Sequence, residues 1–324
     1  MSDLLFLTVC TVRQLPQALA LGQSVDRLHP NATFLIGLAD AEQGIAGINL
    51  PYQVLPVSSM IEPGMLNTLS GQYSPTELAG ALKPTFIRAA YTQFPEVQHL
   101  IYLDPNSAIY APLTPVLERL QTASVLLTPF MQKAPADDAL PDEKYMQNIG
   151  LYNADFLAFR RSAETDRMLP WWEDRVQTRA RIDFCESLCL DQIWLMHVPA
   201  FFDGVQIAKN IDWHRGLWNW HEWGGTADKP EQPLWVNFKG LYNRNEGFFA
   251  YQTRVDPTRD SALQRLLTDY RAGVQRLAQP AFDRPPAYGR QPEKPVVFGW
   301  RRGAVEALRS LVNQINTMPL PVWK

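Results

Sequence analysis

The sequence has 324 residues, 46% of them hydrophobic, which is enough apolar material for a large buried core. Its formal net charge is −3 at pH 7 and no stretch concentrates lysine and arginine, which argues against a nucleic-acid-binding protein. The three cysteines include no Cys-x-x-Cys pair, and their odd number disfavours a disulfide framework. The first residues lack the pattern of a secretory signal and no run reaches the roughly 18 apolar residues of a membrane span, so we expect a cytoplasmic protein.

The first part of the chain predicts a β-α-β unit. Residues 4–9 and 33–38 are short apolar runs typical of buried strands, and residues 14–28 carry apolar side chains at helical spacing. The loop after the first strand lacks the glycines of a dinucleotide fingerprint, which disfavours an NAD-type site. A third short strand is expected at residues 53–57.

Residues 74–77, Ser-Pro-Thr-Glu, predict the start of a helix. Ser74 is a preferred N-cap, Pro75 suits the first helical position, and Glu77 can return a capping bond. Lys83-Pro84 falls inside this helical pattern, where a proline costs roughly 3 kcal/mol or forces a kink. The sequence therefore predicts a helix that is disturbed next to a lysine.

Residues 100–112 hold the strongest chemical signal in the chain. An apolar strand ends abruptly in Asp104, Pro105 stops the strand, and Asn106 adds an amide oxygen. Open α/β sheets bind ligands at the carboxyl ends of their strands. Mg²⁺ and Mn²⁺ take carboxylate and carbonyl oxygens and can bridge to a pyrophosphate, so the pattern suits a nucleotide-diphosphate substrate.

The middle of the chain continues the alternation of helices and strands. Residues 113–120 are expected as a helix and residues 124–128 as a strand. Residues 129–147 are predicted as a polar loop, either a lid beside the substrate or solvated surface. An apolar strand follows at 156–159, and then a helix at 162–176 whose tryptophans favour core packing over ligand contact.

Residues 102–106, Tyr-Leu-Asp-Pro-Asn, resemble the Tyr-Leu-Asp-x-Asp element of nucleotide-sugar-dependent glycosyltransferases of the GT-A fold, especially family 8 and its bacterial relatives. Three further stretches, residues 77–84, 148–153 and 191–194, follow in that family's order. The resemblance covers a whole domain. It implies an α/β GT-A fold, with a Rossmann-like mixed sheet flanked by helices.

The same resemblance implies where the donor binds. The nucleoside would lie near the end of the first strand, with Asp40 as a mere turn residue being the alternative. A kink at Pro84 would turn Lys83 towards the diphosphate, whereas a solvated lysine is the plain alternative. An amide at Asn148 would bind sugar hydroxyls, because an amide both donates and accepts hydrogen bonds. The implied donor-binding residues are Thr8, Cys10, Asp40, Lys83, Asp104, Asn106, Asn148, Gly150, Lys239 and Gly240.

Asp191 and Gln192 resemble the family's Asp-Gln pair, which lies beneath the anomeric carbon of the donor sugar. Glycosyl transfer passes through an oxocarbenium-like centre, so a carboxylate and an amide oxygen beside that carbon stabilise developing positive charge. The resemblance therefore implies catalytic roles for both. The alternative is that Asp191 only caps a helix that runs through Met196.

The implied metal site departs from the family at two positions. Asn106 stands where relatives have a second aspartate, and Asn237 stands where they have a histidine. The resemblance thus implies Mn²⁺ or Mg²⁺ held by Asp104, Asn106 and Asn237, but more weakly, because asparagine coordinates only through a neutral carbonyl. Lys239 could compensate by neutralising the diphosphate directly.

Residues 213–223 contain four tryptophans, two histidines and an asparagine. Zinc is disfavoured there because His214 and His221 lack a third ligand at metal spacing. Relatives share a Trp-Asn-Leu-His-like segment at this place. The segment either supports the acceptor side or locks the fold, and the sequence leaves both open.

The chain is expected to divide near Asp256. We assign residues 1–255 to the catalytic domain, 256–278 to an amphipathic packing helix and 279–297 to a proline-rich linker. Residues 298–324 hold a final helix with a basic start. This helix either lies on a membrane that carries a lipid-linked acceptor, placing the protein at the inner membrane face, or docks on the body or a partner subunit.

The resemblance implies a hexosyltransferase that moves a hexose from a nucleotide-diphosphate sugar to a glycan or lipid-linked acceptor, with retention of configuration, in polysaccharide biosynthesis. The alternative is a catalytically impaired nucleotide-sugar-binding or scaffold protein of the same fold. A sugar-phosphate nucleotidyltransferase is disfavoured, because its glycine-rich loop near the first strand is absent.

Overall fold

The computed structural model divides the chain into two compact units, residues 1–290 and 291–324. The first unit holds the expected catalytic domain together with the helix that follows it. The second unit contains one described helix, α9 (Trp300–Thr317). The described residues are 2–223, 233–243, 252–256, 258–290 and 300–317, so parts of the expected linker and both ends of the expected final segment lie outside them.

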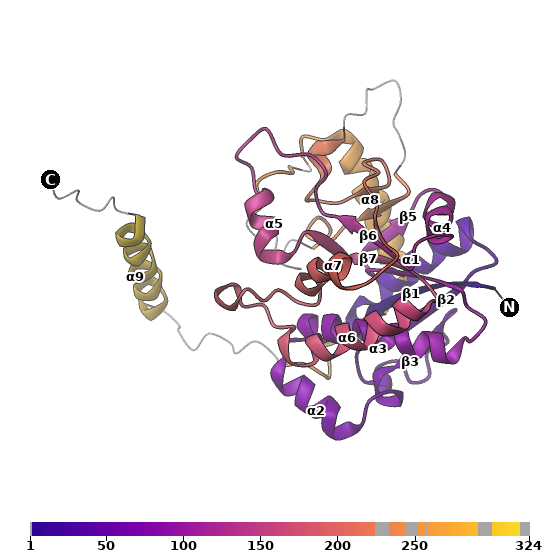
Figure 1. Ribbon diagram of the computed structural model, residues 1–324. Helices are drawn as coiled ribbons and strands as arrows, with labels where there is room; N and C mark the ends of the chain where they lie inside the picture. The colour runs from indigo at the N-terminus through magenta and orange to yellow at the C-terminus, as the bar shows by residue number, and fades with distance from the viewer. Residues whose placement is uncertain (1, 224–232, 244–251, 257, 291–299, 318–324) are drawn as a thin grey trace. The chain divides into compact units, whose positions relative to one another are not determined.

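A seven-stranded sheet forms the centre of the first unit (Figure 1). Its strands are β1 (Leu4–Cys10), β2 (Thr33–Leu38), β3 (Gln53–Pro56), β4 (His99–Leu103), β6 (Val125–Pro129), β7 (Tyr152–Arg160) and β8 (Val205–Ile207). Their order is β3-β2-β1-β4-β7-β6-β8. β7 runs antiparallel to both its neighbours, whereas the other pairs are parallel. The mixed α/β sheet expected from the sequence is confirmed.

Both faces of this sheet are covered because its central strands are apolar on both sides. Successive side chains of a strand point to opposite faces. Leu5 and Leu7 of β1 accordingly enter one core cluster, and Leu4 and Phe6 enter the other. The first cluster packs under α3 (Pro75–Gln93) and α6 (Ala163–Arg179), which lie side by side in Figure 1, and the second packs under α1 (Leu15–Leu28) and α4 (Thr114–Leu120).

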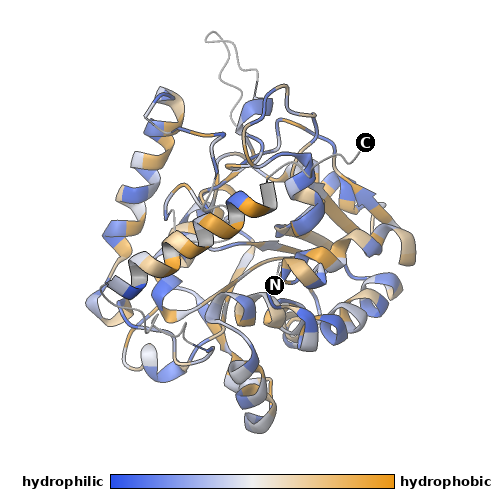
Figure 2. Cartoon of the chain, turned by 90° about the vertical axis from the view of Figure 1, so that its left-hand side faces the viewer, coloured by the Kyte–Doolittle hydropathy of each residue, from blue (hydrophilic) through white to orange (hydrophobic). Residues whose placement is uncertain are grey.

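The hydropathy of the helices fits these positions. Hydrophilic and hydrophobic residues alternate along them in Figure 2, as expected for helices that cover a core on one side and meet solvent on the other. Trp172 of α6 is fully buried and Trp171 is partly buried against the same cluster, which confirms that the tryptophans of this helix pack in the core. The short helix α2 (Pro63–Gln72) precedes α3.

The start of α3 confirms the expected capping box. Ser74 Oγ accepts a hydrogen bond from the Glu77 amide at 3.4 Å, and Glu77 Oε2 accepts one from the Ser74 amide at 2.8 Å. α3 continues without a break from Pro75 to Gln93 with Pro84 inside it, so the proline does not end the helix. Lys83 is only 4% exposed, so the alternative of a solvated surface lysine is wrong.

Two local expectations are corrected. The expected loop at 129–147 contains the start of a helix, α5 (Glu143–Ile149), because Asp142 Oδ1 caps the Tyr145 amide at 2.7 Å. The helix expected through Met196 is instead a 3₁₀ segment, Gln192–His197, followed by the short α7 (Val198–Phe201). Leu190 has a φ of +53°, which lies outside the right-handed helical region and ends any helix before it.

A smaller three-stranded sheet lies beside the main one. Its order is β5 (Ser107–Ile109), β10 (Trp235–Asn237) and β9 (His214–Arg215). It shares a core cluster with α8 (Ser261–Leu277), the helix expected to pack on the catalytic domain. No helix among the described residues is long and apolar enough to cross a membrane.

Two residues of the tryptophan-rich segment, Trp218 and Trp220, belong to the cluster shared with α8, whereas Trp213 belongs to the cluster under α1 and α4. Trp218 is fully buried, and Trp213 and Trp220 are nearly so. Asn219 ties the segment together, because its Oδ1 accepts from the Gly216 amide at 2.8 Å and its Nδ2 donates to the His214 carbonyl at 3.1 Å. The structure therefore favours the fold-locking role for this segment.

Candidate functional site

Two aspartates meet at the carboxyl end of β4. Asp104 directly follows β4, and Asp155 is the fourth residue of β7, the antiparallel neighbour of β4. The pairing continues past the strand, because the Asp104 amide donates to the Asp155 carbonyl at 2.8 Å. Both residues are buried. Two carboxylates thus share one enclosed space, which is unfavourable unless a positive charge joins them.

Lys239 supplies that charge. Its Nζ lies 2.7 Å from Asp104 Oδ2 and 2.7 Å from Asp155 Oδ1. It reaches this place because β10 pairs antiparallel with β5, with Asn237 opposite Ser107, and Lys239 follows β10 by two residues. The smaller sheet therefore delivers a lysine to a carboxylate pair of the larger one.

Two amides complete the carboxylate pair. Asn106 Nδ2 donates to Asp104 Oδ1 at 3.1 Å, and its backbone amide donates to the same oxygen at 2.9 Å. Asn237 Nδ2 donates to Asp155 Oδ2 at 3.1 Å. Asn237 Oδ1 accepts from the Lys239 amide at 2.8 Å. Each carboxylate oxygen of the pair is therefore held by a hydrogen bond or by the ammonium.

The pKa shifts follow from this arrangement. Burial works to raise the pKa of Asp104, but the Lys239 ammonium overcomes it and holds the pKa below the ordinary value. Burial raises the pKa of Asp155 to about 6, with the charge of Asp104 adding to it and Lys239 opposing it. Burial alone would lower the pKa of Lys239, but the two carboxylates raise it. Lys239 is therefore a fixed cation at neutral pH.

A second ion pair, Lys83 with Asp191, lies beside the same part of β7 and is hydrogen-bonded to it. Lys83 Nζ lies 2.6 Å from Asp191 Oδ2 and donates to the Ala154 carbonyl at 2.8 Å. Gly80 makes room for it, since a Cβ there would lie 2.9 Å from Asp191 Oδ1. Asp191 stands at the N-cap position of the 3₁₀ segment but makes no side-chain capping bond, so capping does not explain it.

Gln192 lies beside the loop that enters β7. Its Nε2 donates to the Ile149 carbonyl at 2.5 Å, and the residue is 2% exposed. Gly150 has a φ of +107°, and a Cβ there would lie 3.1 Å from the Gln192 carbonyl oxygen. The backbone thus approaches Gln192 closely at Gly150, as the glycine in the sequence suggested.

The amide expected to bind sugar is placed differently. Asn148 is exposed on α5, whereas Asn153, the second residue of β7, is buried. Asn153 Oδ1 accepts from the Asp155 amide at 2.9 Å. Its Nδ2 has no hydrogen-bond partner within the described part of the chain. A buried amide group with unused donors beside the two ion clusters suits a polar ligand.

The expected nucleoside residues lie at the carboxyl ends of β1 and β2. Thr8 is fully buried and its hydroxyl has no partner among the residues described. Burial, with the charges of Asp40 and Asp104, raises the pKa of the Cys10 thiol, so this cysteine is neutral. Asp40 accepts hydrogen bonds from the backbone amides of Val12, Ala41 and Ala287, at 3.0, 2.8 and 2.8 Å. The segment after α8 thus reaches this end of the sheet.

The three expected metal ligands do not fit a divalent cation in this arrangement. Asn106 and Asn237 direct N–H donors at the carboxylates, and the Asp104 oxygen that faces Asp155 is taken by the Lys239 ammonium. A metal requires oxygens that are directed at it. Within the described ranges no group of three or more His, Cys, Asp and Glu side chains is arranged to hold a metal ion.

Asp155 is the residue of this site that the sequence reasoning missed. It lies in β7, which begins at Tyr152, whereas the sequence predicted a strand only at 156–159. The available signal for a site residue was a carboxylate two residues after Asn153, in a strand that is buried on both sides. Buried carboxylates are rare unless they are paired.

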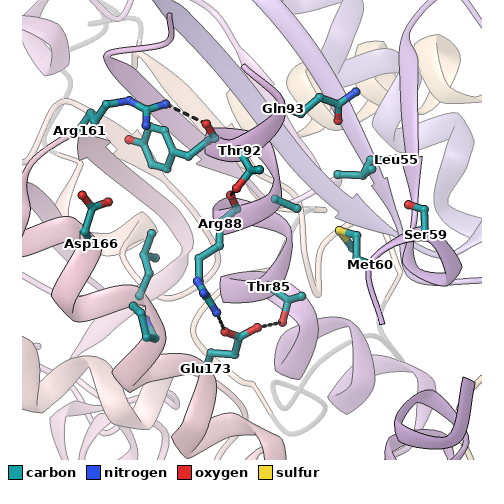
Figure 3. A pocket seen from close by; sticks show the side chains of 14 residues that line it. Leu55, Ser59, Met60, Thr85, Arg88, Thr92, Gln93, Arg161, Asp166 and Glu173 are labelled. Atoms are coloured by element: carbon teal, nitrogen blue, oxygen red, sulfur yellow. Dashed lines mark hydrogen bonds and ion pairs between the residues drawn. The ribbon is translucent and has the colours of Figure 1, made fainter. Parts of the chain in front are cut away.

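A pocket of about 730 Å³ lies elsewhere, between α3, α6 and the end of β3 (Figure 3). Its walls include an ion pair between Arg88 and Glu173, and Glu173 also accepts from the Thr85 hydroxyl at 2.6 Å. None of its lining residues belongs to the Asp104 or Asp191 clusters. We therefore locate the candidate site by its buried charges and not by this hollow.

No family model matches the sequence. The uncharacterized protein YfnF of Bacillus subtilis is 24% identical over 218 residues, which are 66% of this chain and 72% of that protein. The galactosyltransferase LgtC, solved with donor and acceptor sugar analogues, is 16% identical with a TM-score of 0.46, over 83% of this chain and 99% of LgtC. The glycosyltransferase GlyE of Streptococcus pneumoniae is 12% identical with a TM-score of 0.46, over 84% of this chain and 63% of GlyE.

Proposed function

We propose that this protein is a GT-A glycosyltransferase that moves a hexose from a nucleotide-diphosphate sugar to a glycan or lipid-linked acceptor. The observation that carries the proposal is the convergence of two buried ammonium groups, Lys83 and Lys239, on residues 154–155 of β7. They lie beside the side chain of Asn153, whose Nδ2 has no partner among the described residues. Ammonium groups suit a diphosphate and an amide suits sugar hydroxyls. Both stand where open α/β sheets bind nucleotides.

In this proposal the donor lies along the carboxyl ends of β1 and β4 and the amino end of β7, which runs antiparallel to β4. The nucleoside occupies the end of β1 at Thr8 and Cys10, with Asp40 shaping the loop. The diphosphate lies near Lys83, Lys239 and the turn at Gly240. The buried Asn153 contacts the sugar, in place of the exposed Asn148, because only a buried amide is shielded from competing water.

Asp191 and Gln192 are the proposed catalytic pair. Lys83 holds the Asp191 carboxylate in one orientation, at 2.6 Å between Nζ and Oδ2, and so keeps its charge fixed in a buried position. A fixed charge stabilises a developing oxocarbenium centre without reorganisation during the reaction. Gln192 is held by the Ile149 carbonyl through its Nε2, which leaves its Oε1 to face the sugar. Retention of configuration is part of this proposal.

The second unit is the proposed membrane contact. Leu308, Leu311, Val312 and Ile315 recur along α9 at spacings of three and four residues and so share one face. Such a face suits the surface of a membrane that carries a lipid-linked acceptor. We therefore keep a cytoplasmic protein with peripheral contact at the inner membrane face as part of the proposal.

One observation favours a second candidate function, a nucleotide-sugar-binding protein with impaired chemistry. Two buried ammonium groups, of Lys83 and Lys239, face three carboxylates, of Asp104, Asp155 and Asp191. This leaves one net negative charge at pH 7, which opposes the negative charge that develops on the leaving diphosphate as the bond to the sugar breaks, and so slows the chemical step. Tight donor binding without release of nucleoside diphosphate would support this candidate over the enzyme.

Calorimetric titration with UDP, GDP, dTDP and ADP, followed by measurement of nucleoside diphosphate released from the matching sugar nucleotide, tests the proposal. We expect one nucleotide to bind. Asp191→Asn should keep that binding and lower turnover roughly 100- to 1,000-fold, because a fixed charge beside the anomeric carbon is lost. Glu186→Gln removes an exposed carboxylate five residues earlier and should change neither. Unchanged turnover in Asp191→Asn would contradict the assignment, and no binding of any nucleotide would overturn it.

A further inference from the structure

We infer that Lys239 is the permanent cation of the Asp104–Asp155 pair, so that this site works without a divalent metal. The inference concerns the site itself. It rests on the proposed function only where it predicts how nucleotides bind. It also assigns a role to Asp155. This residue provides the second carboxylate of the site, because position 106 holds an asparagine.

The first argument is the position of the ammonium. Lys239 Nζ lies at the same distance, 2.7 Å, from one oxygen of Asp104 and one oxygen of Asp155. Mg²⁺ and Mn²⁺ bind carboxylate oxygens at about 2.0–2.3 Å. A metal that bridged these two oxygens would therefore occupy nearly the same point as Nζ. The ammonium and the metal exclude one another.

The second argument is the hydrogen bonding around the pair. The remaining oxygens, Asp104 Oδ1 and Asp155 Oδ2, accept from Asn106 Nδ2 and Asn237 Nδ2, each at 3.1 Å. Asparagine at these two positions donates N–H hydrogen bonds to the carboxylates, whereas aspartate or histidine there could coordinate a metal. Asn106 and Asn237, the two departures from the expected metal site, thus have one explanation. Both donate hydrogen bonds to the Asp104–Asp155 pair, whose charge Lys239 already neutralises in part.

The third argument is that Lys239 is held in place by its own turn. The Phe238 amide donates to the Asn106 carbonyl at 2.8 Å, and the Leu241 and Tyr242 amides both donate to the Phe238 carbonyl. The Phe238 ring stacks on Tyr270 of α8 at 4.1 Å between centroids. Gly240, with a φ of +75°, allows the tight turn. A tethered cation has a high effective concentration at the site, which a dissolved metal must exceed.

The consequence for a ligand follows from the number of donors. An ammonium has three N–H groups, and Asp104 and Asp155 take two of them. The third can bind one phosphate oxygen directly. Nucleoside diphosphate binding should then be the same in Mn²⁺ as in a chelator, because no step of binding passes through a metal.

Electron paramagnetic resonance of Mn²⁺, titrated into the full-length protein, tests the inference directly. The wild type should leave the signal of free Mn²⁺ undiminished. Lys239→Met uncovers the carboxylate pair and should raise the affinity for Mn²⁺ at least about tenfold. The double variant Lys239→Met/Asp155→Asn removes one carboxylate and should lose that gain. Tight binding of Mn²⁺ to the wild type, with no gain in Lys239→Met, would overturn the inference.

Thermal unfolding provides a readout that survives poor stability of the variant. Lys239→Met leaves two buried carboxylates without a cation, so its midpoint should fall and Mn²⁺ should raise it again. The midpoint of the wild type should not respond to Mn²⁺. Titration of nucleoside diphosphates with Mn²⁺ or with EDTA separates the two proposals. Binding that needs Mn²⁺ refutes this inference alone, whereas absent binding in both refutes the proposed function and leaves the result with Mn²⁺ alone to decide the inference.

Discussion

Lys83 shows how one residue can serve both stability and a site. Its ammonium is almost fully buried, pairs with Asp191, donates to the Ala154 carbonyl and lies 4.7 Å from the centre of the Tyr102 ring. A lysine in this position needs a partner, because burying a lone charge is very unfavourable. The pair therefore fixes both the junction of α3 with β7 and the carboxylate that we propose as catalytic.

Replacing Lys83 by methionine should destabilise the protein by about 3–5 kcal/mol, because the Asp191 carboxylate is left buried without a partner. Urea unfolding monitored by tryptophan fluorescence measures the change. The double variant Lys83→Met/Asp191→Asn removes both charges and should recover part of the loss. Equal losses in the single and double variants would show that packing, and not the ion pair, is responsible.

Single elements position these residues through local rules. The capping box at Ser74 starts α3 so that Lys83 arrives at the sheet on the buried side of the helix, and the pairing of β5 with β10 brings Lys239 back to Asp104. In each element the functional lysine lies a fixed number of residues after the local feature that starts or pairs the element. The offset is set by helical or strand geometry.

The cap of α3 is testable at this scale. Ser74→Ala removes the side-chain acceptor for the Glu77 amide and should cost about 1 kcal/mol of stability. Chemical denaturation measures the loss. Ser58→Ala, a change at an exposed serine outside this cap, is the control and should be close to neutral. A loss in Ser74→Ala no larger than in the control would mean that the box contributes nothing.

The whole molecule should lose stability in acid, in part through His214. Burial, with the nearby charge of Arg215, lowers the pKa of this imidazole to about 3 in the folded state. In the unfolded state His214 takes up a proton near pH 6.5, whereas in the folded state it stays neutral at that pH. Stability from this group is thus complete above about pH 6.5 and falls by up to about 1.4 kcal/mol per unit below it.

Urea unfolding at pH 7, 6 and 5 measures this effect. His214→Phe keeps a flat ring against Trp235, on which His214 stacks at 5.4 Å, but cannot take up a proton. Its stability should fall less steeply with acid than that of the wild type. The same slope in both proteins would assign the acid sensitivity to other groups.

The elements with strong local signals were predictable from the residue pattern. The β-α-β start, the capping box of α3 and the strand that ends in Asp104 each follow from residue pattern, because hydrophobic period, cap chemistry and strand termination act over a few neighbours. The start of α5 was not predicted, because in a short helix among polar residues the N-cap, Asp142, is the only local signal for a helix.

Which charged groups meet depends on the three-dimensional fold. Lys239 and Asp155 are 84 residues apart, and Lys83 and Asp191 are 108 apart. Their pairing depends on the antiparallel entry of β7 between β4 and β6 and on the return of β10 to β5. A sequence pattern names candidate charges, but burial decides which of them must be neutralised and strand register decides by which partner. That is why Asp104 could be found from the sequence and its lysine bridge to Asp155 could not.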